Sequence, residues 1–311
     1  GPLSLRSCAK LDCSNTLVTY GSTHIWRPFA VENSQIFWLD DGFDSGLHAC
    51  GVLLSCDIAG CIGGPRQVDS VPIANCYSAA AFSSDAVYLC SAAPGGQLTK
   101  IPLSGAGPQM VLASPATCMA IAVHGNFVYW IGQTDSLSSP SLRRTRIDGS
   151  ESQVLTEGNR LTADEVATRS FPQRLAFDSD YVYWSQGSLY GSIVRCPLSG
   201  CQDAPEIVAE PVRSPTSLIV DGSTLYFEHD TSSAGLAISS LLLPHGAPTQ
   251  PLVTGVAAER AFAIDERYLY TATTNEVLAP VGGERSYVVD GLWTNPWASV
   301  RRISKTVESA Q

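Results

Sequence analysis

Four arginines stand at related places in the chain, each shortly before a short apolar segment: Arg27, Arg174, Arg213 and Arg260. A guanidinium group forms two parallel hydrogen bonds with a carboxylate or phosphate, so arginines that meet in space predict an anion site. The alternative is that each arginine bonds a loop carbonyl or pairs with a nearby acid. On a chain with a net charge of −10 we favour this alternative.

Aromatic residues accompany these arginines. Phe29 follows Arg27, Phe171 precedes Arg174, and Trp297 lies near the C-terminus. Such rings stack on sugar or aryl ligands, but aromatic residues close to proline more often pack against their own loop. We therefore place Phe29 and Trp297 with the arginines in one candidate ligand site.

The acidic segment LDDGFDSG offers a second kind of chemistry. Asp40, Asp41 and Asp44 could surround a calcium ion with carboxylate oxygens, the ligands that this cation prefers. The segment lacks the spacing and the terminal Glu of an EF-hand loop, so a solvated acidic loop is the favoured interpretation. Calcium is the one cofactor for which the chain shows a candidate site.

Motifs for catalysis are weak. The five histidines are scattered, and the sequence contains no HExxH, no GxSxG and no phosphate-binding loop. An active site assembled from distant loops stays open as an alternative, because catalytic groups need only be neighbours in space. We favour a role without catalysis and name no catalytic residue.

Ten cysteines predict a set of disulfides. Three pairs are separated by four residues and fit a bond across a turn between two strands. Four cysteines remain, and their places in the repeat described below favour one of three connectivities. The predicted bonds are Cys8–Cys13, Cys56–Cys61, Cys196–Cys201, Cys50–Cys76 and Cys90–Cys118, with free buried thiols as the alternative for the last two.

Disulfides predict an oxidising location, which is the bacterial periplasm or the outside of the cell. The opening Gly-Pro-Leu is typical of a cleaved expression tag, so residues 1–3 are set aside and a native leader, with or without a lipid anchor, is expected to precede the chain. No apolar run is long enough to span a bilayer. The acidic balance argues against nucleic acid as a partner.

A nine-residue pattern recurs six times and determines the expected fold. Its copies are AVENSQIFW, AFSSDAVYL, AVHGNFVYW, AFDSDYVYW, IVDGSTLYF and AIDERYLYT, which begin at Ala30, Ala81, Ala122, Ala176, Ile219 and Ala263. Spacings of 41 to 54 residues between strand-like units indicate a β-propeller. Each repeat also contains two further strand-like segments, so each predicts one four-stranded blade.

The two ends of the chain indicate how the propeller closes. Leu3–Gly21 aligns with the third and fourth strands of a repeat, and Asn295–Lys305 resembles the entry to a first strand. The sequence therefore predicts an all-β, single-domain propeller over residues 4–311, with seven blades and one blade built from both termini. Six blades with unpaired termini are the alternative.

The VYW and IFW strands, with RxPLxG-type turns, resemble secreted bacterial propellers, many of them lipoproteins of unassigned function. They also resemble, more distantly, the YWTD propellers of lipoprotein receptors. The resemblance covers nearly the whole chain and implies the propeller fold. The aspartate of YWTD is absent, because Leu39, Ile131 and Ser185 follow the three tryptophans of these strands. Ligand binding of the receptor type is therefore not implied.

The long insertions predict the functional face. They cover residues 40–49, 132–141, 157–172 and 228–235, which all fall in loops on one face of a propeller, while turns on the opposite face are expected to be short. We expect a binding module that holds a protein or saccharide at this face. The alternatives are a hydrolase or lyase acting on a saccharide or lactone at the channel mouth, and an assembly propeller without a small ligand.

Overall fold

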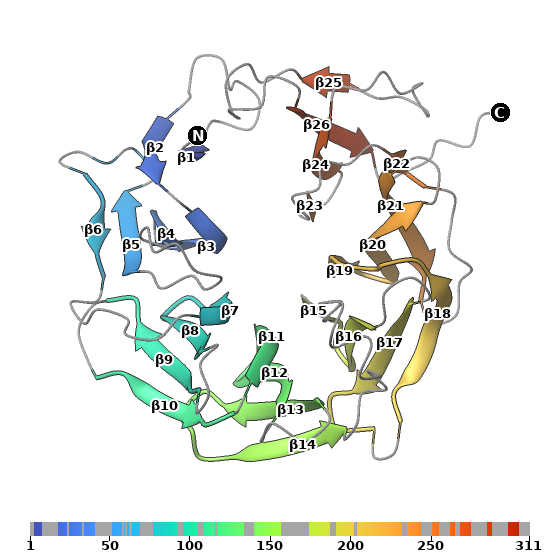
Figure 1. Ribbon diagram of the computed structural model, residues 1–311, viewed down its shortest axis with the longest axis horizontal. Helices are drawn as coiled ribbons and strands as arrows, with labels where there is room; N and C mark the ends of the chain where they lie inside the picture. The colour runs from blue at the N-terminus through green and yellow to red at the C-terminus, as the bar shows by residue number, and fades with distance from the viewer. Residues whose placement is uncertain are drawn as a thin grey trace. The chain divides into compact units, whose positions relative to one another are not determined.

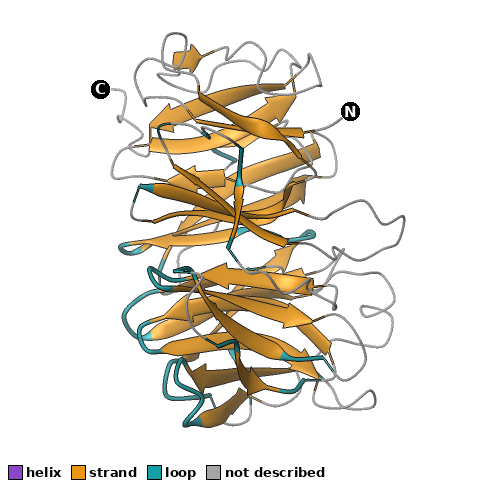
Figure 2. Cartoon of the chain, turned by 90° about the vertical axis from the view of Figure 1, so that its left-hand side faces the viewer, coloured by secondary structure: helices purple, strands orange, loops and turns teal. Residues whose placement is uncertain are grey.

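The computed structural model confirms an all-β chain of antiparallel sheets, and no helix occurs among the described residues (Figure 2). The structure describes residues 3–7, 18–23, 25–32, 34–40, 52–57, 59, 61, 64–68, 77–91, 96–104, 108–115, 117–133, 140–156, 174–186, 191–201, 204–231, 235–243, 251–254, 262–264, 268–274, 285–287 and 298–304.

The chain divides into two compact units, and the first comprises Gly1–Glu157 with Leu292–Thr294. It holds a two-stranded sheet and three four-stranded sheets (Figure 1). The strands are β1 (Leu3–Ser7), β2 (Val18–Thr23), β3 (Ile25–Glu32), β4 (Gln35–Asp40), β5 (Val52–Asp57), β6 (Arg66–Gln67), β7 (Tyr77–Phe82), β8 (Ala86–Ser91), β9 (Leu98–Pro102), β10 (Met110–Ala113), β11 (Thr117–His124), β12 (Phe127–Gln133), β13 (Ser141–Arg146) and β14 (Ser152–Thr156).

The second unit comprises Gly158–Gly291 with Asn295–Gln311 and holds three four-stranded sheets. Its strands are β15 (Leu175–Phe177), β16 (Tyr181–Gln186), β17 (Gly191–Pro197), β18 (Glu206–Val212), β19 (Leu218–Asp221), β20 (Thr224–Thr231), β21 (Gly235–Leu242), β22 (Val253–Thr254), β23 (Phe262–Ile264), β24 (Tyr268–Thr274), β25 (Arg285–Tyr287) and β26 (Ala298–Ser304). We number the four-stranded sheets one to six in chain order.

Sheets one to five are meanders in which each strand pairs with the next along the chain. In such a sheet the connections from strand one to two and from three to four lie at one end, here called the turn end. The connection from strand two to three, and the connection to the next sheet, lie at the other, here called the loop-bearing end. This arrangement is the topology of a propeller blade.

The second strand of each of sheets one to five is buried on both faces. Side chains alternate along a strand, so in β12 Val128 and Trp130 point to one face and Tyr129 to the other. Val128 and Trp130 pack against Tyr88 and Leu98 of sheet two. Each side chain that is fully buried in this way stabilises the fold by about 1.5–3 kcal/mol. The apolar cores of both units therefore lie between consecutive sheets.

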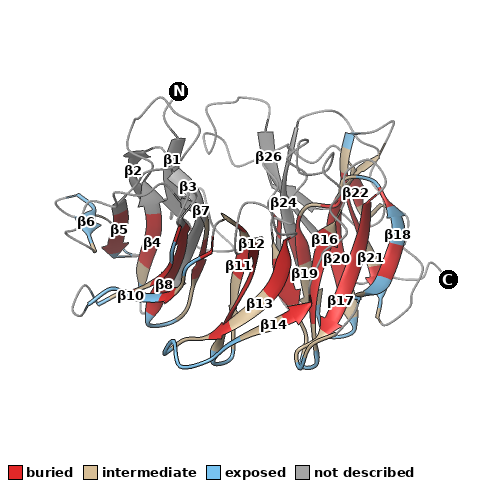
Figure 3. Cartoon of the chain, turned by 60° about the horizontal axis from the view of Figure 1, so that its bottom comes forward, coloured by how far each residue is buried: buried red, intermediate tan, exposed pale blue. Residues whose placement is uncertain are grey.

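Several outer strands carry exposed residues, although parts of β14 and β18 are buried (Figure 3). On β10, Met110 and Val111 are 42% and 50% exposed, and on β18 Ile207 is 52% exposed. The β18 edge also carries two glutamates and a proline. Charged residues and proline at an edge strand limit pairing with another chain.

Three of the predicted disulfides are confirmed. Cys56–Cys61 and Cys196–Cys201 each span the connection from the third to the fourth strand, with Cα atoms 5.3 and 5.2 Å apart. Cys90–Cys118 joins β8 of sheet two to β11 of sheet three, with Cα atoms 5.9 Å apart. The other two predicted bonds, Cys8–Cys13 and Cys50–Cys76, lie outside the described residues. The three bonds indicate an oxidising extracellular or periplasmic environment.

The predicted role of the C-terminus is wrong. Residues 295–305 were expected to enter the first strand of a closing blade, but β26 is the third strand of sheet six and lies between β24 and β25. At the N-terminus β1 and β2 form an antiparallel pair, while their place as the third and fourth strands of a blade stays a prediction. β1 begins at Leu3, within the three residues set aside as a tag remnant. Among the described strands, none from the C-terminal region joins β1 and β2.

Candidate functional site

The structure describes the side chains of two residues of the candidate ligand site, Arg174 and Arg213. Arg27 and Phe29 lie on β3, where only the backbone is described, and Asp40 is the last residue of β4. The remaining candidates lie outside the described residues: Arg260, Trp297, Asp41 and Asp44. The ligand site and the calcium site thus stay predictions for these residues.

The four arginines are not equivalent in register. Arg27 and Arg260 each precede the nine-residue pattern by three residues, Arg174 by two and Arg213 by six. A shift of one residue along a strand points a side chain to the opposite face. The nine-residue pattern therefore does not support an anion site built by all four in the same way.

Arg213 pairs with an acid of the following sheet, as the favoured alternative predicts. Its Nε donates to Oδ2 of Asp230 over 2.9 Å, and the amide of Asp230 donates to the carbonyl of Arg213 over 2.9 Å. The two side chains are 44% and 32% exposed, so the ion pair alone contributes little to stability. Its effect is to fix the connection between β18 and β19 against the end of β20.

This connection continues as an irregular extension of β19. The amide of Thr216 donates to the carbonyl of Glu228, and the amide of Glu228 donates to the carbonyl of Ser217, both over 3.0 Å. Ser214 stands between these bonds and the Arg213–Asp230 clamp with a φ of 46°, in the left-handed region. A non-glycine residue there is strained, and such residues concentrate at binding sites.

Beside the clamp, His229 and Ser239 lie within hydrogen-bond reach. Nε2 of His229 is 2.9 Å from Oγ of Ser239, and Nδ1 is 3.3 Å from the carbonyl oxygen of Asp230. In such a pair the histidine can act as the general base and the serine as the nucleophile. Ser239 is only 1% exposed, however, and the group beyond His229 is a main-chain carbonyl rather than a carboxylate. In this arrangement the pair holds the β20–β21 hairpin together.

Burial lowers the pKa of His229 below its ordinary value of 6.5, and the hydrogen bond and charge of Asp230 offset this only in part. In the window between the lowered pKa and 6.5 the unfolded chain therefore binds more protons than the folded chain. We expect the stability contributed by neutral His229 to be complete above pH 6.5 and to be lost as the pH falls through this window. Urea unfolding at a series of pH values between 5 and 7.5 measures how the free energy of unfolding changes.

His229→Gln should flatten that part of the pH profile, because glutamine can bond Ser239 without titrating. If the free energy of unfolding of His229→Gln depends on pH as it does in the parent protein, His229 is not the group responsible.

One predicted insertion is mostly strand. Residues 228–235 were expected to form a loop, but β20 and β21 continue their pairing as far as Thr231 and Gly235. The extension buries Glu228 completely and places Asp230 beside Arg213, in the connection that enters the same sheet. Neither Glu228 nor Asp230 was among the predicted site residues. The available signal was the segment EHD directly after the apolar strand TLYF.

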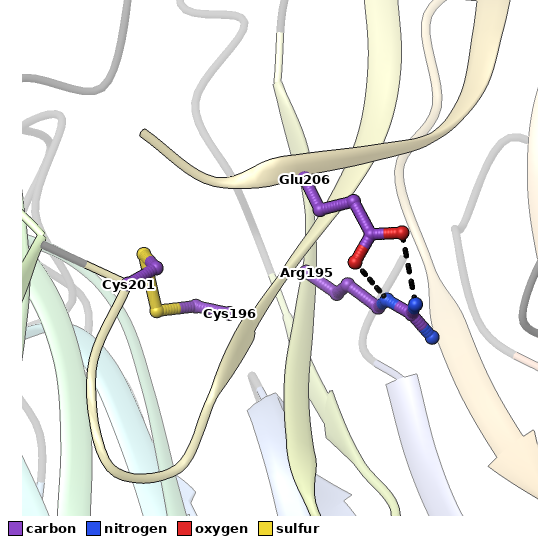
Figure 4. The surroundings of a disulfide bond; sticks show 4 residues. All are labelled: Arg195, Cys196, Cys201 and Glu206. Carbon is purple, nitrogen blue, oxygen red and sulfur yellow. Dashed lines mark hydrogen bonds and ion pairs between the residues drawn. A yellow bond between two sulfur atoms is a disulfide. The ribbon is translucent and has the colours of Figure 1, made fainter. Parts of the chain in front are cut away.

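A second polar cluster lies towards the turn end of sheet four. Arg195 donates from Nε and Nη2 to the two carboxylate oxygens of Glu206 over 2.8 and 2.9 Å, next to the Cys196–Cys201 bond (Figure 4). Its guanidinium also lies 4.2 Å from the ring centroid of Tyr181. The hydroxyl of Tyr183 donates to Asp178 over 2.5 Å, and burial together with this bond raises the pKa of Tyr183.

Part of this cluster recurs in other repeats. A basic residue of the third strand stands opposite the tyrosine of the second strand, as in Tyr88–Lys100, Tyr129–Arg144 and Tyr183–Arg195. The ammonium group of Lys100 lies 5.8 Å from the ring centroid of Tyr88. Such contacts between a cation and an aromatic face stabilise the sheet. We interpret the recurring pairs as structural.

Glu206→Gln should lower the free energy of unfolding by about 1–2 kcal/mol, because it removes the countercharge from an Arg195 side chain that is only 8% exposed. The more exposed pair Lys100–Asp85 supplies the control, and Asp85→Asn should cost well under about 1 kcal/mol. Unfolding in guanidinium chloride compares the free energies of unfolding of the two variants. Equal losses of stability would show that the burial of Arg195 does not determine the effect of Glu206→Gln.

The described residues contain no group of three or more His, Cys, Asp or Glu side chains placed to hold a metal ion. A search of the same residues for a helix able to cross a membrane finds none.

Comparison with solved structures identifies the fold as a β-propeller. Nidogen from a nidogen/laminin complex matches 78% of this chain and 86% of its own, with 13% identity and a TM-score of 0.50. TolB from Acinetobacter baumannii matches 88% and 64%, with 12% identity and a TM-score of 0.53. YCF48 bound to a D1 peptide matches 93% and 94%, with 9% identity and a TM-score of 0.52.

No protein-family model matches the chain, and a search of curated proteins finds no match. At 9–15% identity the structural likeness defines the fold alone. The chain spans less than two thirds of the TolB chain.

Proposed function

We propose that this propeller is an extracellular or periplasmic module that holds a protein or peptide partner at its loop-bearing end. The observation that supports this most is the position of the long connections. The two longest connections between consecutive strands, residues 41–51 and 157–174, each leave their own sheet at its loop-bearing end. Long loops on a rigid scaffold are where binding residues concentrate.

The connections at the turn end are not all as short as the sequence predicted. Connections from the first to the second strand are short there, as in β11–β12 and β19–β20. The connection from β21 to β22 spans residues 243–252, however, and is longer than the turns expected at this end. The loop-bearing end still carries the strained Ser214 and the Arg213–Asp230 clamp.

Two propellers of similar fold support a polypeptide as the partner. Nidogen is seen with laminin, and YCF48 is seen with a D1 peptide. The proposal also keeps three features predicted from the sequence. They are a saccharide as an alternative partner, a calcium ion on Asp40, Asp41 and Asp44, and a native lipid anchor. The hydrolase or lyase alternative depends on arginines and acids that mostly lie outside the described residues.

Site-directed photo-crosslinking tests the proposal with two positions of one sheet. Gln97, directly before β9, is exposed at the loop-bearing end, and Ser84, between β7 and β8, is exposed at the turn end. Each is replaced in turn by benzoylphenylalanine, and the protein is irradiated with the extracellular or periplasmic fraction of the producing cells. We expect a discrete adduct from the Gln97 position and none from Ser84. Adducts from Ser84 alone, or equally from both, would overturn the proposal.

A further inference from the structure

Two tryptophans at the same place in the repeat differ in the partner of their indole N–H. In sheet three, Nε1 of Trp130 donates to Oγ1 of Thr145 over 3.2 Å. Thr145 lies opposite Val128, two residues before the tryptophan. In sheet one, Nε1 of Trp38 is buried and has no hydrogen-bond partner among the described residues. Buried N–H groups are nearly always hydrogen-bonded, so the difference requires an explanation.

The residue that stands in the place of Thr145 in sheet one is Cys56. It lies opposite Ile36, again two residues before the tryptophan, so its side chain and that of Trp38 point to the same face of the sheet. Ile36, Trp38 and Cys56 form one buried cluster, and Cys61 packs against it. The tryptophan therefore packs on a disulfide, whose sulfur is at best a weak acceptor, where sheet three has a hydroxyl.

The two ends of this disulfide differ in exposure. Cys56 is 6% exposed, whereas Cys61 is half-buried in the connection from β5 to β6. A thiolate that attacks the bond must reach a sulfur atom, so Cys61 is the end open to attack and Cys56 is the leaving group. The indole N–H of Trp38 supplies a donor for the thiolate that leaves. Cys90 and Cys118 are only 0% and 4% exposed, so a thiol reaches their bond when the two sheets separate.

The outer strand that this disulfide precedes has a short pairing. β6 comprises two exposed residues, Arg66 and Gln67, which pair with two residues of β5. In sheet four Cys196–Cys201 spans the same connection, but the outer strand β18 is seven residues long. Two hydrogen bonds between Arg195 and Glu206 also fasten β18 to β17. The two outer strands therefore depend on their disulfides to different degrees.

We propose that Cys56–Cys61 is a redox-sensitive switch that controls the outer edge of sheet one. The thiolate of a dithiol reductant attacks Sγ of Cys61, the S–S bond breaks, and Cys56 leaves as a thiolate that accepts the indole N–H of Trp38 and then a proton. The second thiol of the reductant displaces Cys61, so the protein gains two thiols and the reductant becomes a disulfide.

Reduction then releases β6, and the main chain of β5 becomes an open sheet edge, which pairs readily with another strand. Reduction of Cys196–Cys201 leaves β18 in place. The switch lies at the turn end of its sheet, so this inference is independent of the proposed function.

The first test measures how fast each disulfide of the folded, intact chain is reduced. The protein is incubated with dithiothreitol, alkylated at intervals and digested, and mass spectrometry gives the reduced fraction of each bond. Cys56–Cys61 should be reduced at least about tenfold faster than Cys90–Cys118, because a thiolate reaches Cys61 without any opening of the sheets. Equal rates for the two bonds would overturn the inference.

The second test asks whether loss of the disulfide releases β6. Cys56→Ala with Cys61→Ala should raise the hydrogen-exchange rate of peptides that cover β5 and β6 at least about tenfold, without any reductant. Cys196→Ala with Cys201→Ala is the matched control and should leave the exchange of β17 and β18 as it is in the parent protein. Unchanged exchange at β5 and β6, or an equal increase at β17 and β18, would overturn the inference.

Trp38→Phe tests the part assigned to the indole N–H, because it keeps an aromatic ring and removes the donor. Reduction of Cys56–Cys61 should become about tenfold slower. A variant whose packing is merely looser would react faster, so a slower reaction separates the donor from a structural role. Trp184→Phe, the same change in sheet four, is the control and should leave this rate unchanged. An unchanged or faster rate in Trp38→Phe would overturn the proposed step.

Discussion

Gly132→Ala should lower the free energy of unfolding by about 3 kcal/mol or more, which is among the largest single-residue effects expected in this chain. Gly132 stands near the end of β12, where a Cβ atom would overlap the carbonyl oxygen of Thr117 and lie 3.2 Å from Cα of Cys118. Both neighbours are main chain of the paired strand β11. The clash therefore cannot be relieved by rotating a side chain.

Gly222→Ala is the matched control for this variant. Gly222 has a φ of 56°, and nothing lies within 4 Å of the place where its Cβ would stand. Alanine there meets only the strain of the left-handed conformation, about 1 kcal/mol. Thermal and urea unfolding of the two variants separates the clash from the backbone effect. Equal losses would show that β11 gives way, and that the close packing of β11 and β12 is not a rigid feature.

The sequence predicted the strands well where the pattern is local. In the fourth repeat, YVYW predicts a strand, and β16 forms there with Val182, Tyr183 and Trp184 all fully buried. The cysteine pairing across sheets two and three followed in the same way, from positions relative to the repeat. These features depend on residues close together in the chain.

The sixth repeat shows where such reasoning fails. Residues 277–280 and 298–304 both contain residues able to form a third strand, and the choice between them depends on pairing over a long sequence separation. β24 pairs with Ala298–Ser304 along all seven residues of each strand. No local pattern encodes that preference, so the sequence assigned the C-terminal segment to another sheet.

Only the side chains of Arg174 and Arg213 are described among the residues of the candidate ligand site, so that site stays a prediction. The sequence selected the loop-bearing end and Arg213, but Thr216, Ser185 and Gln186, each with a buried polar side-chain atom, carry no signal that distinguishes them from solvent-exposed polar residues. Near them in the chain, Gly191 of sheet four lies against Pro215, which precedes sheet five, so two separate repeats meet there. Such burial becomes visible only when the sheets are packed together.

Removing the Cys90–Cys118 bond should destabilise the protein more than removing either hairpin disulfide. The bond closes a loop with a sequence separation of 28, against 5 for Cys56–Cys61 and for Cys196–Cys201. In the chain-entropy description this corresponds to about 3.5 kcal/mol against about 2 kcal/mol. The double variant Cys90→Ala with Cys118→Ala, compared with Cys196→Ala with Cys201→Ala by urea unfolding, measures the difference.

The same bond should also determine the cost of Gly132→Ala. Cys118 stands opposite Gly132 in the pairing of β11 with β12, and the bond to Cys90 ties β11 to sheet two. Without the disulfide, β11 is freer to move away from a new methyl group, so the two changes together should cost less than the sum of their separate effects. Contacting residues commonly show such coupling, of about 0.5–3 kcal/mol. Additive losses would mean that the disulfide does not restrain β11, and that the pairing of β11 with β12 alone holds it in place.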